Sequence, residues 1–155
     1  MGSARVQAED FDASAEARAL AAGRSDVGAL VTFVGLCRDD GGRLAALEIE
    51  HYPGMAEAEI GRVIAAAEAR WPLLGVRVIH RYGEIAPGEQ IVLVAAASAH
   101  RRDAFEAAEM LMDYLKTQAP FWKRARGVDG SAGDWIEAKP SDDDLAARWR
   151  ARDHA

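Results

Sequence analysis

The chain has 155 residues, half of them hydrophobic, and a formal net charge of −6 at pH 7. This length predicts one domain with a sizeable core, and the high apolar fraction excludes general disorder. No apolar run reaches the ~18 residues of a membrane span, and the acidic start, 1–12, does not resemble a signal peptide. A pI near 5.2 argues against a general nucleic-acid coat. The single cysteine, Cys37, cannot form an internal disulfide, which is typical of a reducing cytoplasm.

The first part of the chain predicts a short helix followed by two strands. The acidic segment 8–23 is expected to contain a short helix, with Ser14 as its N-cap and Gly23 just after its end. Residues 27–36 are apolar on both faces, which predicts a buried strand. Residues 44–52 follow a DDGG turn and alternate between apolar and charged side chains, as a half-buried strand does.

The middle of the chain predicts two amphipathic helices separated by two strands. Apolar residues at three- and four-residue spacing predict a helix over 56–71, which ends before a proline. The strands, 75–83 and 89–98, are joined by a Pro-Gly turn. The second helix, 101–118, is expected to bury one apolar stripe, formed by Phe105, Ala108, Leu111, Met112 and Leu115.

The C-terminal part predicts a β-hairpin over 121–139 with a Gly-rich turn, then a short charged helix over 142–152. Neighbouring strands are joined by short turns, so the order ββαββα plus a hairpin predicts an α+β fold in a single domain, 1–155. We expect residues 1–13 and 150–155 to be flexible.

The basic residues are unevenly distributed. Of the 19, 16 are Arg, and the three Lys all lie within 116–139. The stretch 116–126 (KTQAPFWKRAR) carries four positive charges and no acidic residue, in a protein that is net negative. Such a cationic site on an acidic body predicts an anionic ligand, either a small anion or an acidic peptide tail.

Lys116 and Lys123 bracket two aromatic residues, Phe121 and Trp122, which should fix the backbone between them. Two lysines held close together lower each other's pKa by like-charge repulsion, which makes one of them a candidate base or nucleophile. A lysine at a helix C-terminus is also favoured by the helix dipole alone, so Lys116 has a structural interpretation as well. The aromatic rings could instead stack on nucleic-acid bases, which leaves an RNA- or anion-binding domain as an alternative.

His100 and Arg101 lie where a buried strand passes into a helix. The first N–H groups of a helix have no partner within it, and together with a cation and an imidazole they form a site for an anion. The nearby Asp103 would equally satisfy the dipole of an ordinary first turn. This motif alone leaves both interpretations open.

Cys37 precedes Arg38, and a neighbouring guanidinium favours a thiolate. A small half-buried residue at a strand end is the structural alternative, and the sequence has no spacing of ligands that indicates zinc. His51 and His80 lie in alternating strands, where a single histidine is more often a hydrogen-bonded packing residue than a ligand. We expect that role for both.

Four short motifs in chain order are more specific than any single residue: EHYPGM (50–55), VIHRYG (78–83), SAHRRDAF (98–105) and DYLKTQAPFWK (113–123). Together they resemble the family of the large, catalytic subunit of molybdopterin synthase, and the similar stretches cover nearly all of 27–149. The resemblance implies an α/β-hammerhead-like fold with an added β-hairpin subdomain, which is compatible with the predicted elements.

The resemblance also implies an activity. Members of this family are sulfurtransferases of molybdenum cofactor biosynthesis, which convert cyclic pyranopterin monophosphate into molybdopterin. Sulfur arrives as a thiocarboxylate on the C-terminal Gly-Gly of a small ubiquitin-like subunit, and a homodimer of large subunits forms the core of a 2:2 heterotetramer. We therefore expect a cytoplasmic enzyme that needs no metal or other cofactor on this chain and binds neither nucleic acid nor membrane. A non-catalytic module that binds the same ubiquitin-like tail is the alternative.

The site residues are implied by the same resemblance. Lys116 and Lys123 match two essential lysines and are expected to be catalytic, Lys116 in acid–base or covalent chemistry and Lys123 as its electrostatic partner. The segment 123–125 matches a substrate-lining turn, and Lys139 stands where relatives can carry an Arg contributed across the dimer interface. The expected substrate-binding residues are Leu36, Cys37, Arg38, His100, Arg101, Lys116, Lys123, Arg124, Ala125 and Lys139.

Overall fold

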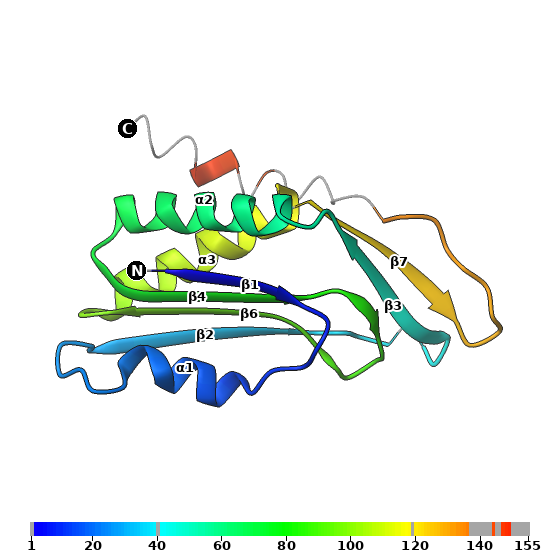
Figure 1. Ribbon diagram of the computed structural model, residues 1–155, viewed down its shortest axis with the longest axis horizontal. Helices are drawn as coiled ribbons and strands as arrows, with labels where there is room; N and C mark the ends of the chain where they lie inside the picture. The colour runs from blue at the N-terminus through cyan, green and yellow to red at the C-terminus, as the bar shows by residue number, and fades with distance from the viewer. Residues whose placement is uncertain (1, 40, 119, 137–143, 145–146, 150–155) are drawn as a thin grey trace.

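A computed structural model of the chain describes residues 2–39, 41–118, 120–136, 144 and 147–149. The helices and strands of this part follow one another along the chain in a mixed order (Figure 1). They are β1 (Ser3–Gln7), α1 (Ala13–Ala21), β2 (Ala29–Leu36), β3 (Leu44–His51), α2 (Met55–Arg70), β4 (Leu73–Arg81), β5 (Gly83–Ile85), β6 (Gln90–Ser98), α3 (Arg101–Thr117) and β7 (Phe121–Gly127).

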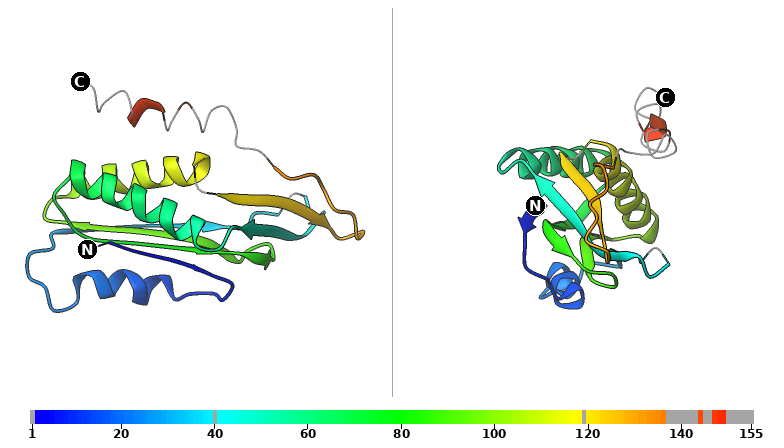
Figure 2. Two further views of the ribbon diagram at one scale, coloured as in Figure 1. Left: turned by 45° about the horizontal axis from the view of Figure 1, so that its top comes forward. Right: turned by 90° about the vertical axis from the view of Figure 1, so that its right-hand side faces the viewer.

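The strands form two sheets. The first has the order β1-β4-β6-β2, with β1 parallel to β4 and the other neighbours antiparallel. The second has the order β5-β3-β7, is antiparallel, and extends from one end of the first (Figure 1). Helices α2 and α3 cover one face of the first sheet and α1 lies against the other (Figure 2). This arrangement confirms the predicted α+β class with an added β subdomain.

The main core lies between the first sheet and the helix pair α2 and α3. Both helices place apolar side chains on the face toward the sheet, as their three- and four-residue spacing requires. The side chains of this core with no exposed surface include Ile60 of α2, Val76 and Val78 of β4, Val94 of β6, and Met110 and Leu111 of α3. The periodicity in the sequence therefore predicts α2 and α3 closely.

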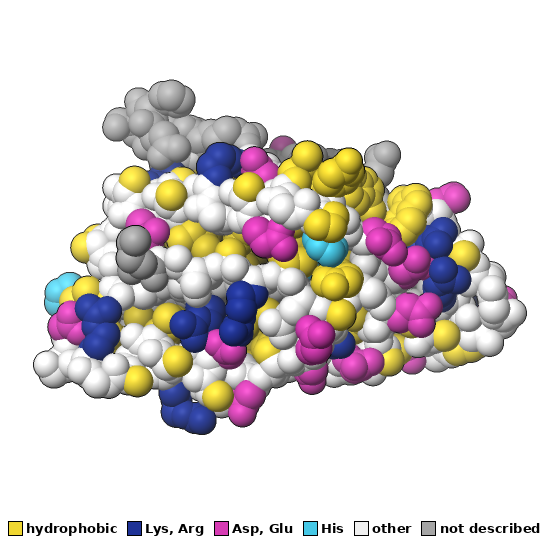
Figure 3. Space-filling model, viewed as in Figure 1, with side chains coloured by type: hydrophobic (Ala, Val, Ile, Leu, Met, Phe, Trp, Pro, Cys, Tyr) yellow, Lys and Arg dark blue, Asp and Glu magenta, His cyan; other side chains and the backbone are white. Residues whose placement is uncertain are grey.

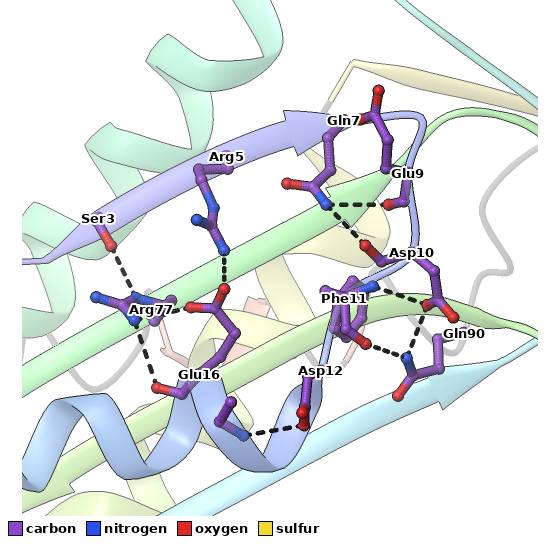
Figure 4. A network of polar contacts seen from close by, with 11 residues as sticks. Ser3, Arg5, Gln7, Glu9, Asp10, Phe11, Asp12, Glu16, Arg77 and Gln90 are labelled. Atoms are coloured by element: carbon purple, nitrogen blue, oxygen red, sulfur yellow. Dashed lines mark hydrogen bonds and ion pairs between the residues drawn. The ribbon is translucent and has the colours of Figure 1, made fainter.

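Strand β1 lies in the N-terminal segment that the sequence analysis expects to be flexible. Ser3–Gln7 pairs in parallel with β4, and polar side chains connect the segment to distant parts of the chain (Figure 4). Glu16 of α1 accepts hydrogen bonds from Arg5 and, at 2.8 Å, from Arg77 of β4. Gln90 donates to Asp10 at 2.8 Å. These contacts fix a segment that is short and that the sequence predicts to be flexible.

The N-cap of α1 is Asp12, so the prediction of Ser14 is wrong. The Asp12 carboxylate accepts a hydrogen bond from the N–H of Ala15 at 3.0 Å and satisfies one of the unpaired groups of the first turn. The helix ends at Ala21, and Gly23 follows with a φ of 71°, where a glycine is favoured as predicted.

Strand β2 lies at the edge of the first sheet, so the prediction of a buried strand is wrong. Leu30, Phe33 and Leu36 are 38%, 42% and 56% exposed, because among the described strands β2 pairs only with β6. Phe105, expected on the buried stripe of α3, is 61% exposed. An open groove between β2 and α3 is lined by Val31, Thr32, Phe33, Phe105, Ala108, Glu109, Met112 and Asp113.

Apolar side chains also gather where the second sheet meets the start of α2 (Figure 3). Tyr52, Met55 and Trp122, which belong to these segments, are 60%, 51% and 45% exposed. None of the described helices combines the length and the apolar character that a membrane crossing needs.

The C-terminal part agrees in outline with the predicted hairpin. After β7 the chain turns back and contacts that strand through two bridges, Arg126 with Ala132 and Lys123 with Ile136. Residues 137–139 of the predicted hairpin lie outside the described part. Of the predicted helix over 142–152, Asp144 and residues 147–149 are described and helical.

Candidate functional site

Lys116 and Lys123 line one pocket at the junction of the two sheets. The pocket contains about 440 Å³ of empty space and is open to solvent. Its walls come from β2, β4 and β6 of the first sheet, from the end of α3 and from β7 of the second sheet. The lining residues are Phe33, Gly35, Leu36, His80, Ile91, Val92, Met112, Leu115, Lys116 and Lys123.

Lys116 reaches the pocket from the last turn of α3. Met112, Leu115 and Lys116 stand at positions i, i+3 and i+4, so all three side chains lie on the same face of the helix. The helix ends at Thr117, and the N–H of Gln118 donates to the carbonyl of Tyr114 at 2.8 Å. The amphipathic stripe that anchors α3 on the sheet therefore also directs Lys116.

Lys123 reaches the pocket from β7, which pairs with β3 so that Lys123 lies opposite Ile49. Alternate residues of a strand point to the same face, so Phe121 and Lys123 share one face and Arg124 lies on the other. Arg124 is bound to Glu48 at 2.8 Å, and its guanidinium lies over the Trp135 ring at 4.5 Å. The strand thus separates a lysine that faces the pocket from an arginine held in an ion pair.

His80 of β4 forms the floor between these elements. Its ring is 4% exposed and lies on the ring of Phe121, with centroids 3.8 Å apart and planes at 14°. Its Nδ1–H donates to the carbonyl of Arg81 at 2.8 Å. Burial first, and then the nearby charges of Lys123 and Lys116, lower the pKa of His80 to about 3, against the opposing effect of that hydrogen bond. The imidazole is therefore neutral.

His80 is a hydrogen-bonded packing residue, and its contacts with the Arg81 carbonyl and the Phe121 ring confirm this prediction from the sequence. The same ring also lines the lysine pocket, a position that the sequence did not predict. The signal available was its position within VIHRYG, one of the four specific motifs. What the sequence could not reveal is the contact between β4 and β7, since they belong to different sheets. Phe121 packs on this ring, so it is not a platform for stacking nucleic-acid bases.

The electrostatic character of the pocket is positive. Among the described residues that line it, none is acidic, while two are lysines and most others are apolar. Charges in an apolar, partly enclosed site interact more strongly than they do in water. The arrangement favours a small anionic ligand or an anionic chain end, as the uneven lysine distribution predicts.

Of the three predicted residues at the end of β2, only Leu36 lines the pocket. Cys37 points away, is 3% exposed, and packs with Ile49 and Ile85. Burial raises the pKa of its thiol, which favours the structural alternative, a small residue at a strand end, over a thiolate next to Arg38. Arg38 is exposed and lies outside the pocket lining.

His100 and Arg101 lie at the other end of α3 from Lys116. His100 is the N-cap residue and Arg101 the first residue of the helix, and both side chains are exposed. At 1.5 Å per residue, the 15 steps from Arg101 to Lys116 span about 22 Å. Within one chain, these two residues therefore do not join the lysine pocket.

The segment 123–125 belongs to strand β7, so its prediction as a turn is wrong. Ala125 lines a different hollow, near Arg43 and Gly127 at the far end of the second sheet. The position of Lys139 lies outside the described residues.

The sequence of the chain is similar to those of known proteins. Residues 6–118 match the sequence family described as MoaE protein. The molybdopterin synthase catalytic subunit of Mesorhizobium japonicum is 64% identical over 147 residues, which make up 95% of this chain and 92% of that protein.

Solved structures give the same result. The MoaE protein of molybdopterin biosynthesis from Burkholderia ambifaria is 46% identical, with a TM-score of 0.83 over 97% of this chain and 99% of that one. The molybdopterin synthase structure from Staphylococcus aureus is 27% identical, with a TM-score of 0.76 over 84% of this chain and 94% of that one.

Proposed function

The chain belongs to the MoaE protein family, and from this premise we propose that it is the catalytic subunit of a molybdopterin synthase. It is a sulfurtransferase of molybdenum cofactor biosynthesis that works in the cytoplasm. It moves sulfur from the C-terminal thiocarboxylate of a small ubiquitin-like subunit to cyclic pyranopterin monophosphate. The observation that carries the proposal is the presence of Lys116 and Lys123 in one pocket whose described lining has no acidic residue.

The charge of the pocket suits both ligands. One carries a thiocarboxylate and the other a cyclic phosphate, so each brings a negative charge toward two ammonium groups. The walls beside the lysines are apolar, formed in part by Phe33, Ile91 and Leu115. A Gly-Gly chain end has no side chains, so only backbone atoms would accompany its terminal thiocarboxylate toward the lysines.

The two lysines divide the chemistry. Lys116 serves as the general acid–base or covalent group at the carbon atoms that receive sulfur, and Lys123 stabilises the negative charge that develops nearby. The sulfur comes from the partner subunit, so no cysteine of this chain takes part. The burial of Cys37 and the raised pKa of its thiol support this assignment.

A complete site requires two copies of this chain. His100 and Arg101 bind phosphate and pterin in the proposal, yet they lie about 22 Å along α3 from Lys116. In a symmetric homodimer, one copy supplies the lysines and the other supplies the His-Arg pair. Lys139 completes the same site across the interface. The exposed apolar side chains of β2 support a second copy packed on that strand.

The other predicted site residues contribute less directly to the reaction. Leu36 forms a wall of the pocket. Arg38 follows it by two residues, is exposed, and attracts phosphate from outside the lining. Arg124 and Ala125 shape β7, since the Arg124 guanidinium is bound to Glu48. These residues therefore affect turnover through the position of Lys123.

The small subunit uses a different surface from the second copy. Two apolar surfaces lie on different elements, one between β2 and α3 and one where β3 and β7 meet α2. Two interfaces on each large subunit support a 2:2 assembly with the homodimer in its middle.

The experiment that tests this function combines the purified chain with a thiocarboxylated small subunit and cyclic pyranopterin monophosphate. We expect molybdopterin to form, and we expect none with a small subunit that ends in an ordinary carboxylate. Binding of the small subunit without any product would instead identify a non-catalytic binding module.

A further inference from the structure

We propose that Gly35 is a specificity-determining residue: because it has no side chain, it leaves open the part of the lysine pocket in which the C-terminal Gly-Gly backbone of the small subunit lies. The proposal rests on the proposed function, which brings that chain end to Lys116. Binding of the chain end can be measured without turnover, so the two can fail separately.

Gly35 lies on β2 opposite the last turn of α3. Phe33 and Gly35 are alternate residues of the strand, so they belong to one face of it. Phe33 and Met112 line both the groove between β2 and α3 and the lysine pocket, so the pocket continues the groove. Further along each element, the lining includes Gly35 on the strand and Lys116 on the helix. A side chain at position 35 would therefore enter the space between β2 and Lys116.

The wall around Gly35 has no room for a methyl group. A Cβ at this position would lie 2.7 Å from Cγ1 of Val92 and 3.4 Å from Cε1 of Phe33, and both side chains line the pocket. Two carbon atoms in favourable contact are about 3.5–4.0 Å apart. Val92 lies opposite Gly35 on β6, is β-branched and packs in the main core, so its side chain has little freedom to turn away. Even alanine at position 35 therefore alters the pocket.

The backbone conformation does not explain this glycine. The pairing of β2 with β6 is irregular between Gly35 and Leu36, but the extra residue is Ile91 on β6. Gly35 is not among the described glycines with a positive φ. A glycine inside a strand costs conformational entropy and adds no packing, and it often marks the close approach of a ligand or another backbone. Since Gly35 lines an open pocket, a ligand accounts for it where its φ does not.

The chain end of the small subunit is the ligand that suits a bare strand. Two backbones approach most closely where neither carries a side chain, and the last two residues of the small subunit are glycines. Gly35 and Lys116 belong to the same pocket of one chain, whereas His100 and Arg101, the proposed anchors of phosphate and pterin, come from the second copy. A side chain on the last residue of the small subunit would meet the wall at Gly35. Position 35 therefore selects a chain end without side chains.

Titration of the full-length protein with the small subunit tests the contact. The wild type should bind the complete small subunit about 10-fold or more tightly than a form that lacks the last two glycines. In Gly35→Ala this advantage should disappear, while the affinity for the shortened form should stay within about twofold of wild type. An undiminished advantage in Gly35→Ala would overturn the proposal. Equal affinities of the wild type for the two forms would overturn it as well.

Gly75→Ala is the matched control. Gly75 also lies in a strand, beside an irregular pairing and without a positive φ, and a Cβ there would lie 3.3 Å from the Leu20 side chain. It does not belong to the lining of the lysine pocket. Gly75→Ala should therefore keep the full advantage of the complete small subunit. Loss of the advantage in both variants would show a general effect of strand glycines and refute the role of Gly35.

A second change separates the steric effect from other effects of the substitution. Val92→Ala removes the carbon atom that a methyl group at position 35 would meet. Added to Gly35→Ala, it should recover part of the advantage of the complete small subunit. In the turnover assay, Gly35→Ala should raise the KM for the thiocarboxylated small subunit about 10-fold and leave kcat within about threefold. A folded double variant without any recovery would refute the steric explanation.

Amide NMR of the wild type decides the question if Gly35→Ala does not fold. The Gly35 signal should shift when the complete small subunit binds and stay in place with the shortened form, while the Gly75 signal should not distinguish the two. An equal response of Gly35 to both forms would overturn the proposal. A wild type that binds the chain end in this way but forms no molybdopterin counts against the proposed function only.

Discussion

The indole N–H of Trp149 donates a hydrogen bond to the Asp113 carboxylate of α3 at 2.6 Å. The indole is 1% exposed and meets Trp71 edge to face, with ring centroids 5.8 Å apart. A residue near the C-terminus thus belongs to the main core, between the two helices that cover the first sheet.

Trp149→Ala should lower the free energy of unfolding by about 3–5 kcal/mol, since it empties a large buried site and leaves Asp113 without this donor. Urea unfolding followed by circular dichroism measures the effect. Trp135, which is 42% exposed, offers the matched control, and Trp135→Ala should cost under about 1 kcal/mol. Equal losses in the two variants would contradict the buried position of Trp149.

Lys116→Ala should reduce single-turnover sulfur transfer by about 10²- to 10⁴-fold, the usual contribution of a general acid–base group. Binding of the small subunit, measured by titration, should change little. Lys116→Arg should not restore transfer, because a guanidinium stays protonated and cannot act as base or nucleophile. If Lys116→Arg is active, Lys116 contributes only its positive charge and does not act as base or nucleophile.

Lys123 should respond differently if its role is electrostatic. Lys123→Ala should impair transfer, and Lys123→Arg should recover part of it because the positive charge returns. The same preformed thiocarboxylate serves as substrate for both variants. A completely inactive Lys123→Arg with normal folding would mean that Lys123 itself moves a proton or forms a bond.

Cys37→Ser should retain most activity, since the thiol points away from the pocket and its pKa is raised by burial. The expected cost is a modest loss of thermal stability, because a hydroxyl replaces a thiol in an apolar cluster. Steady-state turnover and the melting temperature are measured on the same preparation. A loss of about 100-fold in turnover with intact folding would indicate that the thiol takes part in chemistry.

The two-copy site predicts complementation between inactive variants. Lys116→Ala and Arg101→Ala should each be nearly inactive alone. After mixing and exchange, half of the dimers are mixed and each mixed dimer holds one intact site, so about a quarter of wild-type activity should return. Refolding the two variants together, followed by the turnover assay, measures this. An inactive mixture that light scattering shows to be dimeric would place both residues in the same chain's site.

His80 should make the protein sensitive to acid. Its pKa is about 3 when folded and near 6.5 when unfolded, so below about pH 6.5 the unfolded chain binds a proton that the folded chain does not. Above pH 6.5 this group does not lower the free energy of unfolding. Below that pH the free energy of unfolding falls by up to about 1.4 kcal/mol per pH unit toward pH 3. Unfolding curves of wild type and His80→Phe between pH 7 and 4 should diverge in slope. Parallel curves would show that His80 titrates normally.

The sequence predicts the helices that carry strong periodicity. The apolar spacing of α2 and α3 is local, and the core that they cover follows from it. Strand β1 could not be found in this way, because it exists through parallel pairing with β4, far along the chain. The apolar pattern of β2 indicates that its side chains are buried. It does not show that a single copy of the chain leaves several of them exposed to solvent.

The candidate site could also be predicted only in part from the sequence. Lys116 and Lys123 could be assigned from their motif and the uneven distribution of lysines. The separation of His100 from Lys116 follows from helix geometry alone once α3 is accepted. The place of His80 in the pocket depends on a contact between two sheets, and no local pattern contains that information.

Because β7 pairs with β3, the face on which Lys123 lies depends on whether an odd or an even number of residues precedes it in the strand. Inserting one residue between Phe121 and Lys123 would turn the lysine to the face that Arg124 now occupies, beside Glu48. A cation would leave the pocket and become part of a surface ion pair, although the protein would still fold around the same core. Inserting two residues would return the lysine to its original face. Length changes in this strand can therefore preserve the site only in steps of two.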